Sequence, residues 1–411
     1  MAGHARRAAA LMAGIEEADC LLVDYLTEAQ KRAFVIADNR LGLESSWDNE
    51  LVDLHLSQIL EIDAGFDLSL TGFDPRELDQ LTADLYPRDG GVSPRDEHIP
   101  LEEPGPPTSK CGDLIILGDH RVICEDRRDA EPYRRLLGEE RAQLVISDAP
   151  YNVKVQGHVG GAGKVKQREF VMGSGEMSKA EHIAFLSSVF RRLVKFSLSG
   201  SIHFQFMDWR HLGEMLEAGQ ANYTELKNLI VWDKSVGGMG TFYRSRHEMI
   251  FAFKSGDAAH VNNFGLGETG RYRTNVWSYR GLNTGGADRQ EELALHPTAK
   301  PVQMLADAML DCSRRGSVVL DPFGGSGSTL IAAEKTGRRA RLIELDPIYV
   351  DRIARRWQTY TGDDAVFADN GETFDARAKR LKKAREETRL IIRPGRTPTS
   401  RIVDFSMEIR S

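Results

Sequence analysis

The sequence has few cysteines, few aromatic residues and no long apolar run. Its 4 cysteines among 411 residues have neither paired nor metal-ligand spacing, so we expect reduced thiols, a cytoplasmic protein and no metal site. No stretch approaches the roughly 18 apolar residues that a membrane helix needs. Basic residues are not in excess either, because 54 Lys and Arg face 61 Asp and Glu. A uniformly basic coat for nucleic acid is therefore excluded, whereas a local basic surface is not.

Composition divides the chain into four zones. Residues 1–85 are rich in helix formers. Prolines and glycines among acids make 86–110 an extended linker, because proline fixes φ and removes a backbone donor. Residues 111–362 alternate strand-like and helix-like runs, and we expect the catalytic domain there. The polar extension 363–411 carries a basic run, which we interpret as a solvated helix face.

Six short apolar runs in the third zone are typical of strands buried on both faces. They are 143–147, 201–206, 229–232, 249–253, 317–320 and 340–343. Helical patterns lie between them, at 178–193, 301–315 and 329–336. This alternation predicts an α/β protein with a doubly wound sheet. Such sheets bind ligands beyond the carboxyl ends of their strands.

One of these strands runs into a glycine turn and then into a helix. The turn reads Asp321-Pro322-Phe323-Gly324-Gly325-Ser326-Gly327, and Glu344 ends the next strand. Glycines let a ligand approach the backbone closely, and an acid at that strand end accepts hydrogen bonds from ribose hydroxyls. The segment favours a ligand that contains a nucleoside, although a tight turn without a ligand fits it as well. Neither the dinucleotide fingerprint nor the phosphate-binding P-loop pattern is met.

A second loop directly follows the strand at 143–147. It reads Asp148-Ala149-Pro150-Tyr151. Asp148 supplies an acceptor, Tyr151 a flat ring for stacking, and Pro150 a stiff backbone that aims a carbonyl group. This set suits a planar base with an exocyclic amine. On these residues alone an ordinary turn is an equal interpretation, because Asp, Pro and Tyr are common in turns.

Together with a third motif, these loops resemble the amino-group DNA methyltransferases that use S-adenosylmethionine. Residues 148–151 match the catalytic Asp-Pro-Pro-Tyr of that family, with Ala149 in place of a proline. The glycine turn matches the cofactor loop, and 296–302 (His-Pro-Thr-Ala-Lys-Pro-Val) matches a further box. The catalytic tetrapeptide precedes the cofactor loop, which is the order of the β subgroup. The resemblance covers about residues 113–360 and implies the Rossmann-like methyltransferase sheet.

The resemblance implies a role for each matching residue. Asp148 and the Ala149 carbonyl would hold the amine of a base flipped out of double-stranded DNA, while Tyr151 stacks on that base. An opening aspartate favours adenine N6 as the target, whereas serine favours cytosine N4. The residues expected around S-adenosylmethionine are Lys300 near its carboxylate, Asp321 near its amino group, Glu344 at the ribose, and Phe323, Gly324, Gly325, Ser326 and Gly327 along the methionine part.

Two further segments are expected to contact DNA. The first is a glycine-rich basic loop beside the tetrapeptide, and the second mixes cations with aromatic residues within 233–295, the expected target-recognition region. Their cations are Lys154, Lys164, Lys166, Arg168, Arg271 and Arg273. A surface loop and a half-buried strand are the alternative interpretations. The sequence leaves a homodimer open.

The N-terminal zone resembles the ParB-like domain of chromosome-partition proteins. The resemblance rests on Gly3-His4-Ala5-Arg6 and on residues 26–41, where Thr27 and Gln30 form a capping box at the start of a helix. The strands that precede this element in the family are missing ahead of Met1. We therefore expect a truncated ParB-like remnant that assists DNA binding and has no nuclease activity.

Three other functions stay open on the sequence. N4-cytosine methylation differs from adenine methylation only in the target base. A non-catalytic, partition-like DNA-binding protein with a degenerate methyltransferase fold would follow if Ala149 abolishes transfer. A Rossmann oxidoreductase is the most distant alternative, because the dinucleotide fingerprint is absent.

Overall fold

The computed structural model describes residues 11–14, 25–40, 94–100, 105–153, 175–237, 242–264, 272–281 and 299–391, and single positions between 52 and 78. Its strands are β1 (Leu114–Leu117), β2 (His120–Cys124), β3 (Ala142–Ser147), β4 (Ser197–Met207), β5 (Glu225–Asp233), β6 (His247–Ser255), β7 (Val276–Ser278), β8 (Val318–Asp321), β9 (Arg339–Glu344) and β10 (Val366–Phe367). Within these ranges they form one ten-stranded sheet, in the order β10-β1-β2-β9-β8-β3-β4-β6-β5-β7.

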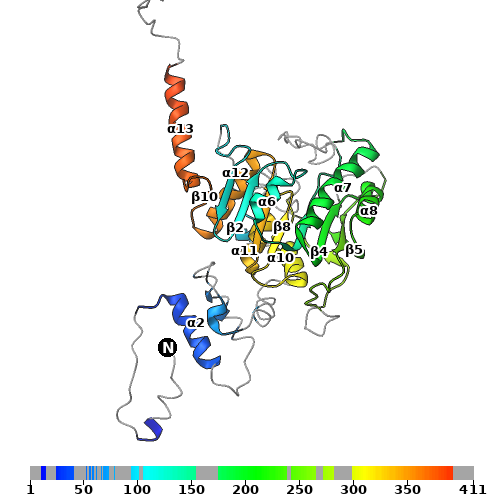
Figure 1. Ribbon diagram of the computed structural model, residues 1–411. Helices are drawn as coiled ribbons and strands as arrows, with labels where there is room; N and C mark the ends of the chain where they lie inside the picture. The colour runs from blue at the N-terminus through cyan, green and yellow to red at the C-terminus, as the bar shows by residue number, and fades with distance from the viewer. Residues whose placement is uncertain are drawn as a thin grey trace, which may run out of the picture.

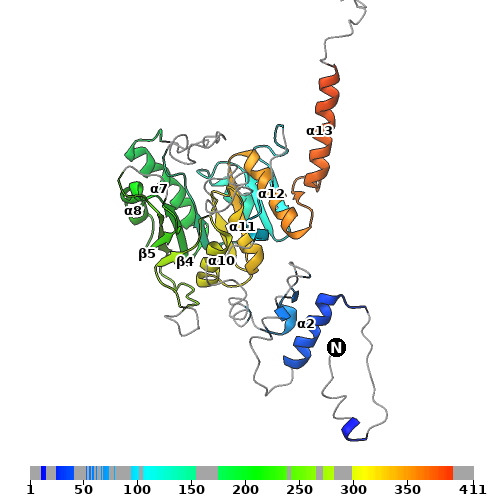
Figure 2. The same ribbon diagram turned by 180° about the vertical axis from the view of Figure 1, so that it is seen from behind.

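Helices cover both faces of the sheet. One face carries α10 (Val302–Cys312), α11 (Ser328–Thr336) and α12 (Pro347–Thr361), and the other carries α6 (Glu131–Leu137), α7 (Lys179–Lys195) and α8 (Leu212–Gln220), as Figures 1 and 2 show from opposite sides. Each helical layer closes a separate apolar core against the strands. The doubly wound α/β class is therefore confirmed, with β1 and β6 running antiparallel to the strands of the parallel centre.

The order of the strands reverses between β8 and β3. These two strands pair in parallel, with Leu144 opposite Val319. From β8 the parallel sheet continues to β9 and β2, and from β3 it continues to β4 in the other direction. The loops after β8 and β3 therefore leave the sheet at the same edge, where doubly wound proteins bind their ligands. We call the edge at which β3 and β8 end the carboxyl edge.

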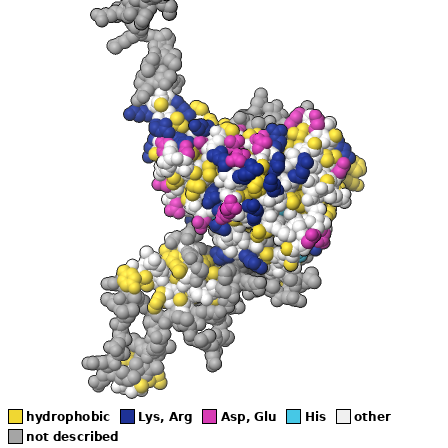
Figure 3. Space-filling view, viewed as in Figure 1, with side chains coloured by type: hydrophobic (Ala, Val, Ile, Leu, Met, Phe, Trp, Pro, Cys, Tyr) yellow, Lys and Arg dark blue, Asp and Glu magenta, His cyan; other side chains and the backbone are white. Residues whose placement is uncertain are grey.

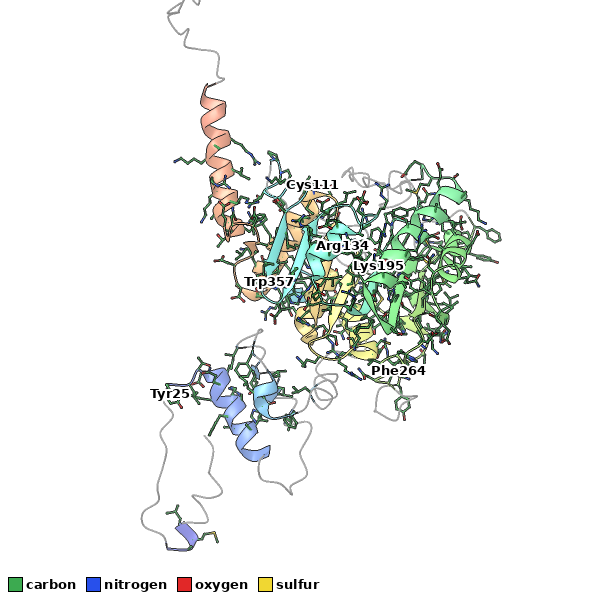
Figure 4. The ribbon with its side chains drawn as sticks, viewed as in Figure 1. Tyr25, Cys111, Arg134, Lys195, Phe264 and Trp357 are labelled. Atoms are coloured by element: carbon green, nitrogen blue, oxygen red, sulfur yellow. The ribbon has the colours of Figure 1, made fainter. Side chains whose placement is uncertain are left out.

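Basic side chains gather on the face that α6 and α7 cover (Figure 3). Arg134 and Lys195, which Figure 4 labels, lie on this face, and both are exposed. Figure 4 also labels Trp357 of α12, on the other helical layer. Its ring packs against the turn between β1 and β2, where a Cβ on Gly118 would lie 3.1 Å from it. The local basic surface that the charge balance allowed is thus present.

The segment expected to be an extended linker packs against the catalytic domain over 94–100. It contains one helical turn, α5 (Pro94–Glu97). Asp96 forms an ion pair with Lys335, and the Glu97 carboxylate accepts a 2.7 Å hydrogen bond from the Val302 backbone at the start of α10. We correct the expectation for this segment. Its prolines break regular structure, but its acids have basic and N–H partners that the local composition did not show.

The N-terminal zone begins with α2 (Glu28–Arg40), and its capping box is confirmed. The Thr27 N–H donates to the Gln30 side chain over 3.0 Å, and the Gln30 N–H donates back to the Thr27 hydroxyl over 3.3 Å. One face of α2 joins a small core of its own. The described members of that core are Ala29, Ala33, Ile36, Val52, Leu56, Ile59, Leu68, Phe73 and Leu78. Leu68 belongs to η1 (Leu68–Thr71). The residues Gly3 to Arg6 lie outside the described ranges.

The polar C-terminal extension forms α13 (Phe374–Ile391), which projects from the domain in Figure 1. Its expected solvated basic face holds for Lys379 and Lys382, which are exposed. Arg377 differs, because it is buried and forms ion pairs with Asp113 and Glu372. None of the helices in the described ranges is long and apolar enough to cross a membrane.

Candidate active site

The tetrapeptide 148–151 leaves β3 at the carboxyl edge and is anchored by the residue that follows it. Asn152 adopts a left-handed backbone conformation with φ of 54°. Its side-chain amide donates to the Met177 carbonyl over 2.7 Å and accepts from the N–H groups of Met177 and Gly175 over 3.1 Å each. Asn152 thus ties the chain that leaves the tetrapeptide to the chain that enters α7.

The glycine turn adopts a conformation that depends on its glycines. Gly325 and Gly327 have φ of 49° and 79°, in the left-handed region that favours glycine. A Cβ on Gly324 would lie 3.0 Å from Ile353 Cδ1, so α12 packs directly on the turn. Arg356, which the sequence analysis missed, donates to the Ser326 carbonyl over 2.8 Å. The turn is therefore fixed by α12, and Gly325 is its one residue that is partly exposed.

A buried carboxyl group at the end of β8 links the two loops electrostatically. Asp321 accepts hydrogen bonds from the Phe323 N–H over 2.8 Å and from the Thr329 hydroxyl over 2.6 Å. These hydrogen bonds lower the pKa of Asp321, but burial outweighs them and raises it to about 7. The negative charges of Asp148 and Glu344 add to the rise. Asp148 therefore lies within electrostatic reach of the glycine turn.

Glu344 is held at the end of β9 with both carboxylate oxygens oriented. One oxygen accepts the Gly325 N–H over 2.9 Å, and the other accepts the Asp346 N–H over 2.9 Å. A carboxylate has about four acceptor sites, so Glu344 keeps sites for two ligand hydroxyls. Together with Asp321, it gives this part of the edge hydroxyl acceptors and negative charge. These residues fit a ligand with a ribose and cationic groups, as S-adenosylmethionine has.

Lys300 contacts the tetrapeptide and the start of β6. Its ammonium, with the residue only 6% exposed, contacts Asp148 Oδ2 at 2.7 Å, Glu248 Oε2 at 3.2 Å and the Tyr151 hydroxyl at 3.2 Å. Burial would lower the pKa of Lys300, but the two carboxylates outweigh it and raise the pKa. A buried ammonium needs anionic partners, and it has them in the tetrapeptide and β6, while its expected place near a cofactor carboxylate stays a prediction.

Glu248 is a site residue that the sequence analysis missed. It stands at the start of β6, accepts a 3.0 Å hydrogen bond from the Tyr151 hydroxyl and forms an ion pair with Lys234. Burial opposes its ionisation, but Lys300 and Lys234 outweigh burial and lower the pKa of Glu248 to about 2. An acid directly before the apolar run 249–253 was the available signal.

The Tyr151 hydroxyl has one proton and two carboxylate neighbours. It lies 2.7 Å from Asp148 Oδ1 and 3.0 Å from Glu248 Oε2, so it donates to one of them at a time. Burial raises the pKa of Asp148; Lys300 opposes this rise and Glu248 adds to it. Because Glu248 is the more acidic group, Asp148 is the carboxylate that takes up a proton first. Asp148 can thus accept hydrogen bonds and can also take up a proton.

The ring of Phe323 packs into the core. It is 8% exposed, with the Arg127 guanidinium 4.4 Å above its centroid and the Phe185 ring edge-on at 6.3 Å. We correct the expectation that this ring faces the methionine part of a ligand. The partners of the ring come from α7 and the loop after β2, which the motif alone did not reveal.

Arg273 is not available for DNA contact. Its guanidinium donates to Asp311 over 2.8 Å and to the Tyr279 hydroxyl over 3.1 Å. Asp311 lies near the end of α10, at the edge opposite the carboxyl edge, so we correct this expectation as well. The other expected DNA contacts, Lys154, Lys164, Lys166, Arg168 and Arg271, lie outside the described ranges, as does His296. The described residues contain no cluster of three or more metal-type ligands.

Comparison with known families agrees with this geometry. A family model described as DNA methylase matches residues 142–356, which is more than half of the chain. The chain belongs to this DNA methylase family. A second family model, described as the ParB-methyltransferase HTH domain, matches residues 49–111. The ParB-like resemblance is therefore confirmed, but the matching unit is a helix-turn-helix domain that extends through the expected linker.

The methylase has relatives among curated proteins. It is 31% identical to the type II methyltransferase M2.DpnII of Streptococcus pneumoniae over 169 residues, which are 39% of this chain and 58% of that protein. It is 34% identical to the type II methyltransferase M.ScaI of Streptomyces caespitosus over 82 residues, which are 20% of this chain and 27% of that protein. The chain thus spans less than two thirds of either relative.

Two solved structures are also similar. The M1.HpyAVI–SAM complex has a TM-score of 0.41 and 17% identity, covering 57% of this chain and 98% of that one. The cytosine-N4-specific PvuII DNA methyltransferase has a TM-score of 0.44 and 12% identity, covering 70% and 96% respectively.

Proposed function

We propose that this protein transfers a methyl group from S-adenosylmethionine to the exocyclic N6 of adenine in double-stranded DNA at a specific site. One observation carries the proposal: the tetrapeptide 148–151 and the glycine turn 321–327 leave adjacent parallel strands at the switch point, and the negative charge of Asp148 helps to raise the pKa of Asp321. Membership in the DNA methylase family supports it. DNA as the substrate also agrees with the expected cytoplasmic location.

The cofactor would lie along the glycine turn. Glu344 would accept its ribose hydroxyls, and Asp321 would meet its cationic amino group. When bound, S-adenosylmethionine supplies a methyl group that is already activated on a sulfonium. Most of the work left to the protein is then to hold the amine in line with that methyl group.

The tetrapeptide would hold and activate the amine. Asp148 Oδ and the Ala149 carbonyl accept its two hydrogens, which draws the nitrogen lone pair out of conjugation with the ring. The nitrogen then forms the new N–C bond as the C–S bond breaks and its electron pair goes to sulfur. One amine proton goes to Asp148, whose raised pKa suits a proton acceptor. Because Ala149 keeps its carbonyl, this arrangement survives the loss of the family proline.

Lys300 must yield its place before the amine can bind. Its ammonium lies 2.7 Å from Asp148 Oδ2, an oxygen that the amine also requires. Glu248 lies 3.2 Å from the same ammonium and stays ionised, so it can hold Lys300 when the base arrives. In this proposal Lys300 is a positioning residue that favours ionised Asp148 and orients it between turnovers, and Glu248 is a positioning residue that holds Lys300.

The preference for adenine rests on Asp148 as the first residue of the tetrapeptide. N4-cytosine methylation is the second candidate, because the family includes both reactions. A nucleoside digest of DNA methylated in vitro separates the two by mass. N6-methyladenine is the expected product, and N4-methylcytosine as the sole product would overturn the adenine assignment.

The activity itself is tested with purified full-length protein, tritiated S-adenosylmethionine and unmethylated plasmid DNA. We expect transfer by the parent and by Asp364→Ala, an exposed aspartate on the C-terminal side of α12. Asp148→Ala should abolish transfer while the protein still binds S-adenosylmethionine in calorimetry. If the parent transfers no methyl group and Asp148→Ala behaves like it, the chain is the non-catalytic DNA-binding protein instead.

A further inference from the structure

The loop between β5 and β6 carries two aromatic side chains that stand almost fully in solvent. Phe242 is 88% exposed and Tyr243 is 85% exposed, and their ring centroids lie 4.5 Å apart in an edge-to-face pair. Val236, on the other arm of the loop, is 52% exposed. Burying an aromatic ring away from water is among the most favourable contributions that a side chain makes to free energy. In the folded chain these two rings are not buried. We call Phe242 and Tyr243 the aromatic tip.

The base of this loop is ordered. The Lys234 N–H donates to the Arg246 carbonyl over 2.8 Å, and the Arg246 side chain forms an ion pair with Asp233. Across the loop, the Arg244 guanidinium donates to the Gly237 carbonyl over 2.8 Å. The aromatic tip is therefore presented to solvent by a braced hairpin.

The hairpin stands on the carboxyl edge beside the tetrapeptide. β4 runs parallel to β3, while β6 pairs antiparallel with both β4 and β5, so β5 ends at the same edge as β3. Glu248 comes two residues after Arg246 and accepts the 3.0 Å hydrogen bond from the Tyr151 hydroxyl. One short element thus joins the aromatic tip to the catalytic loop.

We propose that the aromatic tip inserts into the DNA base stack beside the target base and fills the place that this base leaves when it rotates out. The inference rests on the proposed function, because it requires a flipped base. A stack of bases offers flat apolar faces for Phe242 and Tyr243, and phosphates lie outside it. Arg244 and Arg246 on the same hairpin are both exposed and suit those phosphates. Aromatic wedges of this kind fill duplexes that a protein opens.

The expected effect follows from what the wedge replaces. Stacking of a base on an aromatic side chain corresponds to roughly 10- to 100-fold in a rate or affinity. This gain matters when an intact base pair must be opened. It matters little when the target base has no pairing partner, because less pairing and stacking is then lost on rotation.

The test uses the double variant Phe242→Ala/Tyr243→Ala and a matched control, Leu198→Ala. Leu198 is an apolar residue that is 44% exposed, but it stands at the start of β4, at the edge of the sheet opposite the carboxyl edge. The probes are two duplex oligonucleotides that contain the site mapped by modified-base sequencing. In one the target base is paired, and in the other it faces an abasic position. Single-turnover methyl transfer is measured on both, and fluorescence is measured on matched duplexes in which 2-aminopurine replaces the target adenine.

We expect the double variant to lose about 10- to 100-fold in rate on the paired duplex and less than about threefold on the abasic duplex, with a smaller fluorescence rise on the paired one. Leu198→Ala should match the parent on both. Equal losses on the two duplexes, or no loss, would overturn the wedge. It would also be overturned if the parent is a dimer, the double variant is a monomer and methyl transfer is unchanged. A parent that transfers to neither duplex, while Asp148→Ala binds DNA as the parent does, shows instead that the proposed function has failed.

Discussion

Replacing Glu248 by glutamine tests the charge arrangement around Asp148. The Glu248 carboxylate contacts the ammonium groups of Lys300 and Lys234, so two carboxylates balance two ammonium groups. Glutamine keeps the shape of the side chain and removes its charge. Lys300 then retains Asp148 as its carboxylate partner among the described residues. We expect the ammonium to stay on Asp148 Oδ2, where it competes with the incoming amine.

The magnitude follows from the hydrogen bond that Glu248 offers to Lys300. A hydrogen bond to a charged group contributes about 1.5–3 kcal/mol, and about 1.36 kcal/mol changes a rate tenfold. Glu248→Gln should therefore lower kcat by about 10- to 100-fold. It should also lower the free energy of unfolding by about 3 kcal/mol, because it leaves a buried ammonium with one carboxylate fewer.

The pH dependence provides a second, signed readout. Asp148 must be ionised to accept the amine, so kcat falls as the pH drops through its pKa. Burial raises that pKa, Lys300 opposes the rise and Glu248 adds to it. Glu248→Gln removes a charge that raises the pKa, so the acid limb of the profile should move to lower pH. Lys300→Met removes a charge that lowers the pKa, so the limb should move to higher pH.

Single-turnover rates at saturating DNA, measured as a function of pH, check both effects. The matched control is Glu140→Gln, because Glu140 is also a carboxylate held by two cations, Arg339 and Arg341, but stands at the opposite edge of the sheet. It should change kcat less than about twofold and leave the acid limb in place. The reasoning is refuted if Glu248→Gln leaves kcat unchanged, if its limb moves to higher pH, or if the control matches it.

Three further predictions concern the cofactor side of the site. Affinity for S-adenosylmethionine should fall as the pH drops below about 7, because protonated Asp321 no longer attracts a cation. Calorimetry from pH 6 to 8 checks this, and Asp321→Asn should remove the pH dependence of the affinity. Gly324→Ala should cost about 1–3 kcal/mol in urea unfolding and weaken cofactor binding, because the new Cβ meets Ile353 at 3.0 Å. Glu97→Gln should lower the free energy of unfolding by about 1 kcal/mol and reduce kcat, because the start of α10 at Val302 loses a charged acceptor; urea unfolding and methyl transfer measure the two effects.

The sequence was sufficient for the elements that carry the chemistry. Continuous apolar runs predicted β3 and β8, because strands in the middle of a parallel sheet are buried on both faces. The rule that ligands bind at the carboxyl ends of such strands then brought 148–151 and 321–327 to one edge, and the pairing of β3 with β8 bears this out. The capping box predicted at Thr27 also held.

The ion-pair partners of charged side chains could not be predicted from the sequence. Lys300, Asp148 and Glu248 come from three segments that are at least 52 residues apart, and only the assembled sheet shows that their charges meet. The same holds for Asp96 and Glu97, whose surroundings suggested a solvated linker until Lys335 and the start of α10 were placed beside them. Periodicity reports which face of an element is apolar, but it does not report which charge lies opposite.

The two loops at the carboxyl edge differ in their charge balance, and this difference matches the two proposed ligands. Around Asp148, the ammonium groups of Lys300 and Lys234 balance the carboxylates, so this side suits a neutral base that brings only hydrogen-bond donors. Around Asp321, the acting charges are the negative ones of Asp148 and Glu344, and they help to hold its pKa near 7. That carboxyl group becomes fully ionised at neutral pH when a positive charge arrives beside it. A cationic methyl donor supplies such a charge, whereas a neutral nucleoside does not. Calorimetry should therefore find S-adenosylmethionine bound with proton release near pH 7, and 5′-methylthioadenosine bound without it.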